Sequence, residues 1–209
     1  VSLLTRRAYI QQIEAPSFSP SQKYAKALLS ALPFEMTGAQ KRVSKEIADD
    51  LKLNKPMLRL VQGDVGAGKT LVAGVAACHA LEEGWQVALM APTEILAEQH
   101  YLNFKKWFEP LGLSVSWLSG KQKGKARAAA EQIIKDGSAH LIVGTHALFQ
   151  ENVEFAKLGL VIIDEQHRFG VDQRLALRNK GLDGMTPHQL VMLWDMRRWR
   201  LSGAVIHIG

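Results

Sequence analysis

The sequence predicts an α/β domain in which a mainly parallel central sheet is flanked by helices. Short apolar segments at residues 57–61, 86–91, 140–143 and 160–163 alternate along the chain with longer segments of helical periodicity. Such alternation is typical of strand–helix–strand units. A glycine-rich loop follows the first of these segments, and two acidic residues follow the last. Because parallel strands in such sheets end at a common ligand-binding edge, both motifs are expected there.

The composition is that of an ordinary globular chain with a basic balance. The 209 residues suffice for one α/β domain, and 47% of them are hydrophobic while 22% are charged. The formal net charge of +6 suits a polyanionic partner, although charge alone is a weak indicator. No segment reaches the roughly 18 apolar residues of a membrane span, and none resembles a secretory signal. The single cysteine, Cys78, lies in an apolar run and is interpreted as core filler in a reducing cytoplasm.

The first 33 residues are interpreted as a connector from a preceding domain. Residues 14–21 are rich in proline and serine, and residues 22–32 show the pattern of a short amphipathic helix that ends before Pro33. The main domain is expected to span residues 34–192.

Two interpretations of Gln40 are open from spacing alone. Val43, Ile47 and Leu51 recur at every fourth position, which predicts a helix with Thr37 as its N-cap. Thr37 and Gln40 then match a capping box, in which the glutamine side chain bonds back to the helix start. Alternatively, the Gln40 carboxamide recognises the donor–acceptor edge of an adenine, because it can donate and accept at once.

The glycine-rich loop reads G-D-V-G-A-G-K-T and predicts a site for nucleotide phosphates. Its glycines let successive backbone N–H groups turn toward phosphate oxygens, and the next helix presents its positive N-terminus to the same anion. Lysine reaches the β- and γ-phosphates, and threonine ligates Mg²⁺. The eight residues are Gly63, Asp64, Val65, Gly66, Ala67, Gly68, Lys69 and Thr70.

The middle of the chain supplies further strand ends with polar residues. Residues 71–81 are apolar almost all round, which predicts a buried helix in which His79 is an ordinary helix residue. After the strand at 86–91, Thr93 is either a plain N-cap or a contact to a phosphate backbone. After the strand at 140–143, Gly144 and Thr145 form either a turn or another phosphate contact.

A basic loop follows the strand predicted at residues 113–118. Its charges are Lys121, Lys123, Lys125 and Arg127. They are either a solvated face or a track for a nucleic-acid backbone, and the spacing does not decide between these interpretations. A helix is expected to follow through Ile133.

The strand at 160–163 ends in two carboxylates. Asp164 is expected to hold Mg²⁺ through its hydration shell, and Glu165 to orient and deprotonate the attacking water. Together with the phosphate loop, this pair predicts ATP hydrolysis.

Taken in order, these motifs resemble the first motor domain of superfamily 2 DNA helicases. They read T-G-A-Q, G-D-V-G-A-G-K-T, A-P-T-E-I-L-A-E-Q-H, G-T-H-A-L and D-E-Q-H. The loop sequence together with I-D-E-Q-H-R-F-G is similar to the RecG family over residues 22–192. Transcription-repair coupling factors and PriA-like helicases are the alternatives, but the former usually carry D-E-E-H where this chain has Gln166.

The resemblance implies a RecA-like fold, ATP with Mg²⁺ as cofactors, and duplex or branched DNA as partner. It favours adenine recognition by Gln40 and implies that Gln166 and His167 couple the nucleotide site to DNA. It further implies a motor that remodels replication forks and Holliday junctions, in the cytoplasm of a bacterium. The DNA-backbone contacts implied by the resemblance are Thr93, Gly120, Thr145 and His146.

The end of the sequence departs from the family pattern. After the strand expected at residues 189–192, the family pattern calls for Thr/Ser-Ala-Thr, whereas this chain continues L-W-D-M-R-R-W-R. Residues 193–209 are therefore predicted to be a divergent, non-family tail. Helicases of this kind also need a second motor domain and a fork-binding domain, so these 209 residues alone are expected to bind nucleotide but hydrolyse it weakly. The alternative is a nucleotide-responsive module that grips DNA or a protein without catalysis.

Overall fold

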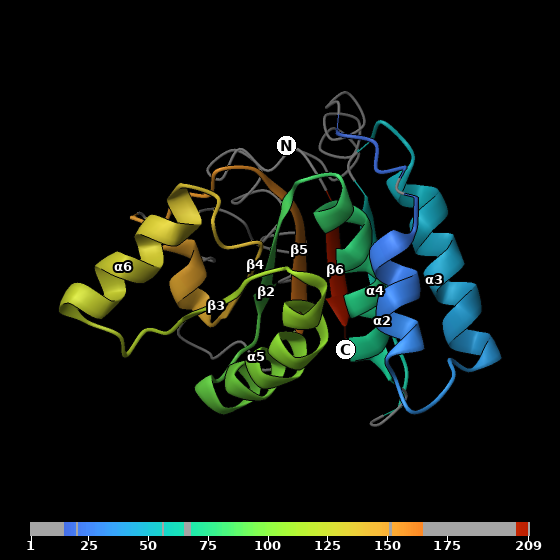
Figure 1. Cartoon of the computed structure of the whole chain (residues 1–209), viewed down its shortest axis with the longest axis horizontal. Helices are drawn as coiled ribbons and strands as arrows, with labels where there is room; N and C mark the ends of the chain where they lie inside the picture. Colours follow the sequence, from blue (N-terminus) through green and yellow to red (C-terminus); the bar gives the residue numbers. More distant parts are fainter. Residues whose placement is uncertain are drawn as a thin grey trace, which may run out of the picture.

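A parallel β-sheet forms the centre of the protein and confirms the predicted fold class. The structure is a computed structural model, and it describes residues 15–19, 21–55, 57–64, 68–150, 152–164 and 204–208. Among these residues the sheet has six strands in the order β1-β6-β5-β2-β4-β3, and every neighbouring pair is parallel (Figure 1). The strands are β1 (Leu58–Val61), β2 (Gln86–Met90), β3 (Val115–Leu118), β4 (Leu141–Gly144), β5 (Leu158–Asp164) and β6 (Ala204–Ile208).

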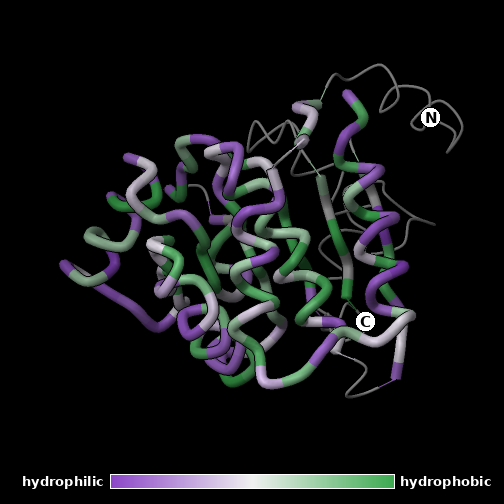
Figure 2. Tube along the Cα trace, turned by 45° about the vertical axis from the view of Figure 1, so that its right-hand side comes forward, coloured by the Kyte–Doolittle hydropathy of each residue, from purple (hydrophilic) through white to green (hydrophobic). Residues whose placement is uncertain are grey.

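Alternating side chains of the central strands fill two separate cores, one on each face of the sheet. Val87, Leu89 and Leu160 belong to one core, whereas their neighbours Ala88 and Val161 belong to the other. This alternation is the period-two geometry of a strand that is buried on both sides. Figure 2 shows the resulting concentration of hydrophobic residues along the central strands, with hydrophilic residues over the outer helices.

Helices cover both faces. The larger core is shared by α2 (Lys23–Ser30), α3 (Gly38–Leu51), α4 (Lys69–Glu82) and α5 (Glu94–Phe108), and the 3₁₀ turn η1 (Glu109–Leu111) follows α5. The smaller core lies under α6 (Gly124–Lys135) and the 3₁₀ turn η2 (His146–Phe149). No helix in the described part of the chain is long and apolar enough to cross a membrane.

Of the helices that the structure describes, α4 is the most deeply buried, as its uniformly apolar sequence predicts. Every residue from position 71 to 81 is buried, because the sheet lies on one side while α2 and α3 pack on the other. Cys78 is fully buried there, and burial raises the pKa of its thiol to about 12. Its interpretation as core filler is therefore confirmed.

The described part of the 1–33 segment packs on the main domain. Phe18 is buried against Trp85 with its ring edge-on, and Leu28 of α2 lies in the larger core. The assignment of residues 1–33 as a connector stays a prediction, but residues 15–33 have no separate core in the described structure.

Strand β6 is a feature that the sequence did not predict. Residues 204–208, from the segment predicted to be a divergent tail, pair with β1 on one side and β5 on the other. Ala204, Ile206 and Ile208 are buried in the larger core. The strand expected at residues 189–192 lies outside the described residues. That residues 193–209 diverge from the family stays a prediction; whatever their origin, 204–208 complete the sheet here.

Candidate nucleotide and nucleic-acid site

Apart from Gln40 on α3, the predicted site residues that the structure describes follow the carboxyl ends of strands and therefore lie along one edge of the sheet. The phosphate loop follows β1, Asp164 ends β5, Thr93 follows β2, and Thr145 directly follows β4. Gly120 follows β3 at the far end. The strand order places the phosphate loop and Asp164 in one half of this edge and the three candidate DNA contacts in the other. Ligands of open parallel sheets bind at this edge.

The strand register sets the phosphate loop and Asp164 level with each other. Asp164 is opposite Ile208 of β6, and Ile208 is opposite Val61, the last residue of β1. Two strand spacings of about 4.8 Å separate the Asp164 and Val61 backbones by roughly 10 Å. A nucleotide phosphate with its metal ion fits between groups at that separation.

Lys69 is folded into its own loop. It is the first residue of α4, and its ammonium donates hydrogen bonds to the carbonyl oxygens of Gly63 at 2.6 Å and Asp64 at 3.0 Å. The lysine charge is therefore held at the positive end of α4, where a phosphate would accept from both. Val65, Gly66 and Ala67 lie outside the described residues.

Gln40 makes the capping box that the sequence predicts. Its Oε1 accepts from the Thr37 backbone N–H at 2.8 Å, and its own N–H donates to Thr37 Oγ1 at 3.3 Å. The amide nitrogen of the same side chain lies against Gly68, where an added Cβ would collide with it. Gly68 has φ +72°, a conformation in which glycine is favoured. The cap thus holds Gln40 against the phosphate loop, while its role toward adenine stays a prediction.

Asp164 and Thr70 are suited to Mg²⁺ rather than to a metal held mainly by protein. Both offer a side-chain oxygen, and Mg²⁺ usually takes one or two protein ligands with phosphate and water oxygens. In the part of the chain that the structure describes, no cluster of three or more His, Cys, Asp or Glu side chains could hold a metal. Glu165, Gln166 and His167 lie outside the described residues.

His100 is a buried partner of Asp164 that sequence reasoning missed. It lies on α5, is 7% exposed, and its Nε2 is hydrogen-bonded to Oδ2 of Asp164. The two residues are 64 positions apart in the chain, so no spacing signal connects them.

Most of the predicted DNA contacts are engaged within the protein. Thr93 is the N-cap of α5, where its hydroxyl accepts from the Leu96 N–H at 3.3 Å. The Gly120 N–H donates to Oε1 of Glu94 at 3.2 Å, and the Thr145 hydroxyl reaches the same oxygen at 3.5 Å. Thr145 is only 2% exposed.

His146, the fourth predicted DNA contact, is exposed. Glu94 itself was not predicted, because an acid in the first turn of a helix is the usual choice there and carries no further signal.

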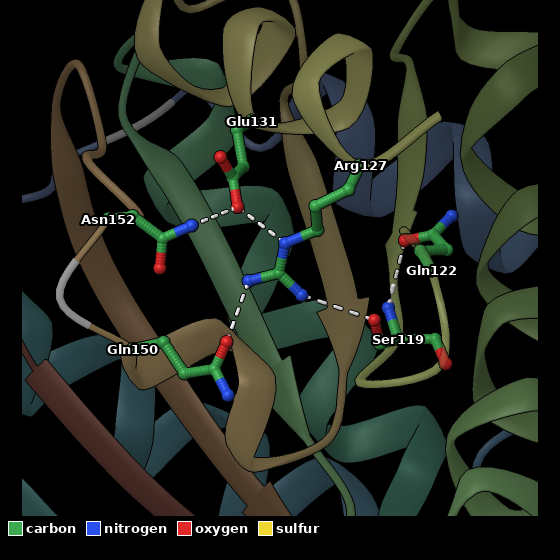
Figure 3. Close-up of polar contacts among 6 residues, drawn as sticks. All are labelled: Ser119, Gln122, Arg127, Glu131, Gln150 and Asn152. Carbon is green, nitrogen blue, oxygen red and sulfur yellow. Dashed lines mark hydrogen bonds and ion pairs between the residues drawn. The ribbon is translucent and has the colours of Figure 1, made fainter. Parts of the chain in front are cut away.

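Arg127 holds the basic loop in place and does not extend toward solvent. Its guanidinium is paired with Glu131, donates to the Ser119 carbonyl at 3.2 Å, and donates to Gln150 Oε1 at 3.0 Å (Figure 3). Asn152 donates to the same carboxylate of Glu131. Of the four basic residues of this loop, Arg127 therefore fits neither open interpretation.

The three remaining charges of the basic loop are exposed: Lys121, Lys123 and Lys125. They are available to a polyanion, as the sequence allows.

Comparison with known proteins identifies the relatives. Residues 37–193 match the DEAD/DEAH box helicase family. The chain is 60% identical over 193 residues to the ATP-dependent DNA helicase RecG of Escherichia coli K12, covering 92% of this chain and 28% of that protein. It is 46% identical to RecG of Aquifex aeolicus, over 92% of this chain and 24% of that protein. It thus spans about a quarter of the length of these relatives.

Solved structures agree with this assignment. A structure of RecG bound to a three-way DNA junction aligns with a TM-score of 0.77 and 34% sequence identity, over 98% of this chain and 25% of that one. A hypothetical ATP-dependent RNA helicase from Sulfolobus tokodaii aligns with a TM-score of 0.59 at 16% identity, over 90% of this chain and 50% of that one, and shows the fold alone. The resemblance inferred from the motifs is confirmed, and the chain belongs to the DEAD/DEAH box helicase family.

Proposed function

We propose that this chain is the nucleotide-binding motor domain of a double-stranded DNA translocase that remodels replication forks and Holliday junctions. The observation that carries the proposal is the division of one sheet edge. The phosphate loop and Asp164 occupy the β1–β5 half, and Thr93, Gly120 and Thr145 occupy the β2–β3 half. Its similarity to RecG helicases, one of which is described on a three-way DNA junction, supports the same proposal.

ATP would bind through the loop at residues 63–70. Its backbone N–H groups and Lys69 supply the positive charge, and the two carbonyls that now hold Lys69 give way to phosphate oxygens. Thr70 and Asp164 would hold Mg²⁺, which on binding neutralises charge on the β- and γ-phosphates. Gln40, already fixed beside Gly68, would meet the adenine.

Hydrolysis would depend on residues next to Asp164. Glu165 orients and deprotonates the attacking water, and Gln166 with His167 relays the nucleotide state toward DNA. Arginines from a second motor domain would be worth about 10³ to 10⁵ in rate, by analogy with related NTPases. We therefore propose that these 209 residues by themselves turn over ATP slowly.

DNA would bind by its phosphate backbone along the other half of the edge. The contacts are those named from the resemblance, together with Lys121, Lys123 and Lys125, which are exposed in the basic loop. Duplex or branched DNA is the proposed partner, with a fork-binding domain supplying the preference for junctions. This activity belongs in the bacterial cytoplasm, on the nucleoid.

Titration with a fluorescent ATP analogue, with and without duplex DNA, tests the proposal. We expect nucleotide binding that Lys69→Ala abolishes and that Lys45→Ala, a change at an exposed lysine of α3, leaves intact. DNA should change the nucleotide affinity, because a motor couples its two sites. Unaltered affinity in Lys69→Ala would overturn the phosphate-loop assignment. A DNA affinity that is the same with and without nucleotide would instead identify a binding module without a motor role.

A further inference from the structure

His100 joins helix α5 to the tip of β5 through a buried polar contact. Its Nε2 is hydrogen-bonded to Asp164 Oδ2, and the two side chains are 9% and 13% exposed. The contact crosses from the helix that follows β2 to the strand beside it. Asp164 is the residue proposed above to hold Mg²⁺, so His100 contacts a side chain of the proposed metal site.

The surroundings of His100 fix both the ring and its tautomer. Phe104, one turn further along α5, meets the imidazole edge-on at a centroid distance of 6.3 Å. The other ring nitrogen, Nδ1, is buried and has no hydrogen-bond partner among the residues that the structure describes. A proton on Nδ1 would be an unsatisfied buried donor, which is costly, so the proton belongs on Nε2 and is donated to the carboxylate.

An interior placement alone does not explain a histidine here. Buried polar atoms are nearly always paired, and an apolar side chain of similar size would fill the same space without leaving Nδ1 unpaired. Within the described part of the chain, the one polar interaction that His100 makes is with Asp164. Any functional role of the His100 ring must therefore involve the Asp164 carboxylate.

We infer that His100 is a positioning residue for Asp164, and the inference rests on the proposed nucleotide-binding function. By donating to Oδ2, the imidazole fixes the rotation of the carboxylate and leaves Oδ1 for the hydration shell of Mg²⁺. Residues that orient a metal ligand in this way typically contribute 10- to 100-fold to metal affinity.

The same contact ties the metal site to the other half of the edge. Glu94, which receives the Gly120 N–H, lies six residues before His100 on α5. That separation is about 9 Å along a helix axis. A displacement of the first turn of α5 would therefore also move His100, and through its hydrogen bond the Asp164 side chain, because both turns belong to one helix.

The test compares nucleotide affinity in Mg²⁺ with affinity in EDTA, for the whole 209-residue chain and a fluorescent ADP analogue. In the unaltered protein Mg²⁺ should tighten binding. His100→Ala should lower the apparent Mg²⁺ affinity about tenfold while the affinity in EDTA stays the same. His100→Gln should restore part of the effect, because its amide nitrogen can donate from nearly the position of Nε2. Gln99→Ala, at the exposed neighbouring position, is the matched control and should change neither value.

The outcomes separate this inference from the proposed function. If the analogue binds but Mg²⁺ has no effect on the unaltered protein, the proposed metal site is overturned and this inference with it; if the analogue does not bind at all, the proposed nucleotide-binding function is overturned. If Mg²⁺ tightens binding equally in the unaltered protein and in His100→Ala, only the role of His100 is overturned. An equal loss of affinity in Mg²⁺ and in EDTA would mean a structural role and would overturn it too. Should His100→Ala unfold, the comparison of His100→Asn with His100→Gln decides, because asparagine is too short to reach Asp164.

Discussion

The backbone N–H of Gly120 and the carboxylate of Glu94 are hydrogen-bonded at 3.2 Å, although Gly120 lies in the loop after β3 and Glu94 in the first turn of α5. The Thr145 hydroxyl reaches the same oxygen. Two groups that the family resemblance assigns to DNA phosphates therefore converge on an anion that the protein itself supplies. A DNA phosphate that approaches the Gly120 N–H and the Thr145 hydroxyl must displace the Glu94 carboxylate or bind close to its negative charge.

Glu94→Gln should therefore strengthen DNA binding. Two unit charges about 5 Å apart in water repel by roughly 0.8 kcal/mol, which corresponds to about fourfold in affinity. The effect should shrink at high salt, because exposed charges are screened. Fluorescence anisotropy of a labelled duplex at two salt concentrations measures it. The control is Glu98→Gln, an equal charge change one turn along α5 at an exposed position; the same gain in both variants would mean that only net charge matters.

Gly68→Ala should lower the free energy of unfolding by more than the cost of a left-handed backbone conformation alone. Gly68 and Gly84 flank α4 with nearly equal φ values of +72° and +77°. A Cβ at Gly84 meets nothing within 4 Å, whereas one at Gly68 collides with Gln40. Gly84→Ala should therefore lower the free energy of unfolding by about 1–2 kcal/mol, the usual cost of the left-handed conformation. Gly68→Ala should cost more and also weaken nucleotide binding.

A double substitution isolates the collision. Gln40→Ala removes the amide that a Cβ at position 68 would strike, so part of the Gly68→Ala penalty should disappear in the Gly68→Ala/Gln40→Ala protein. Urea unfolding of the four proteins gives the coupling energy. Strict additivity would show that the contact between Gln40 and Gly68 is not limiting.

Substitution of Arg127 should lower stability, whereas substitution of an exposed lysine should weaken DNA binding without affecting stability. The Arg127 side chain is 13% exposed and paired with Glu131, so Arg127→Ala removes the cation from the half-buried Glu131 carboxylate, which keeps its bond from Asn152, and removes a donor from the Ser119 carbonyl. We expect the free energy of unfolding to fall by about 1–3 kcal/mol. Lys123→Ala should leave stability unchanged and reduce the slope of log affinity against log salt by about 0.9, if Lys123 contacts one phosphate. Equal effects of the two changes on the salt slope would show that Arg127 also contacts DNA.

The sequence predicts features that depend on residues close together in the chain and misses those that join distant residues. The capping box of Thr37 and Gln40, the N-cap at Thr93 and the buried helix at 71–81 depend on neighbours a few residues away. The structure shows all three, although each cap is only one of two interpretations that the sequence leaves open. The apolar runs predict the strands, because a strand buried on both faces is apolar along its whole length.

The missed features all join distant parts of the chain. Asp164 meets His100 across 64 positions, Gly120 meets Glu94 across 26, and Arg127 meets Gln150 across 23. The pattern of a sequence does not specify such pairs, because they depend on strand order. The same reason explains β6: residues 204–208 have a strand-like composition, but nothing local says that they pair between β1 and β5.

Acidification should destabilise the protein through His79. This residue is 5% exposed in α4, and burial lowers the pKa of its imidazole below the ordinary value of 6.5. The unfolded chain therefore binds a proton near pH 6.5 while the folded protein resists it. The contribution of the neutral ring to stability is complete above that pH and is lost as the pH falls toward the folded pKa.

Urea unfolding at pH 7.5 and pH 5.5 measures this loss of stability, and His79→Leu should make the loss smaller. His146→Leu, the same substitution at an exposed histidine, is the matched control. Identical pH dependence in His79→Leu and the unaltered protein would assign the acid sensitivity to other groups.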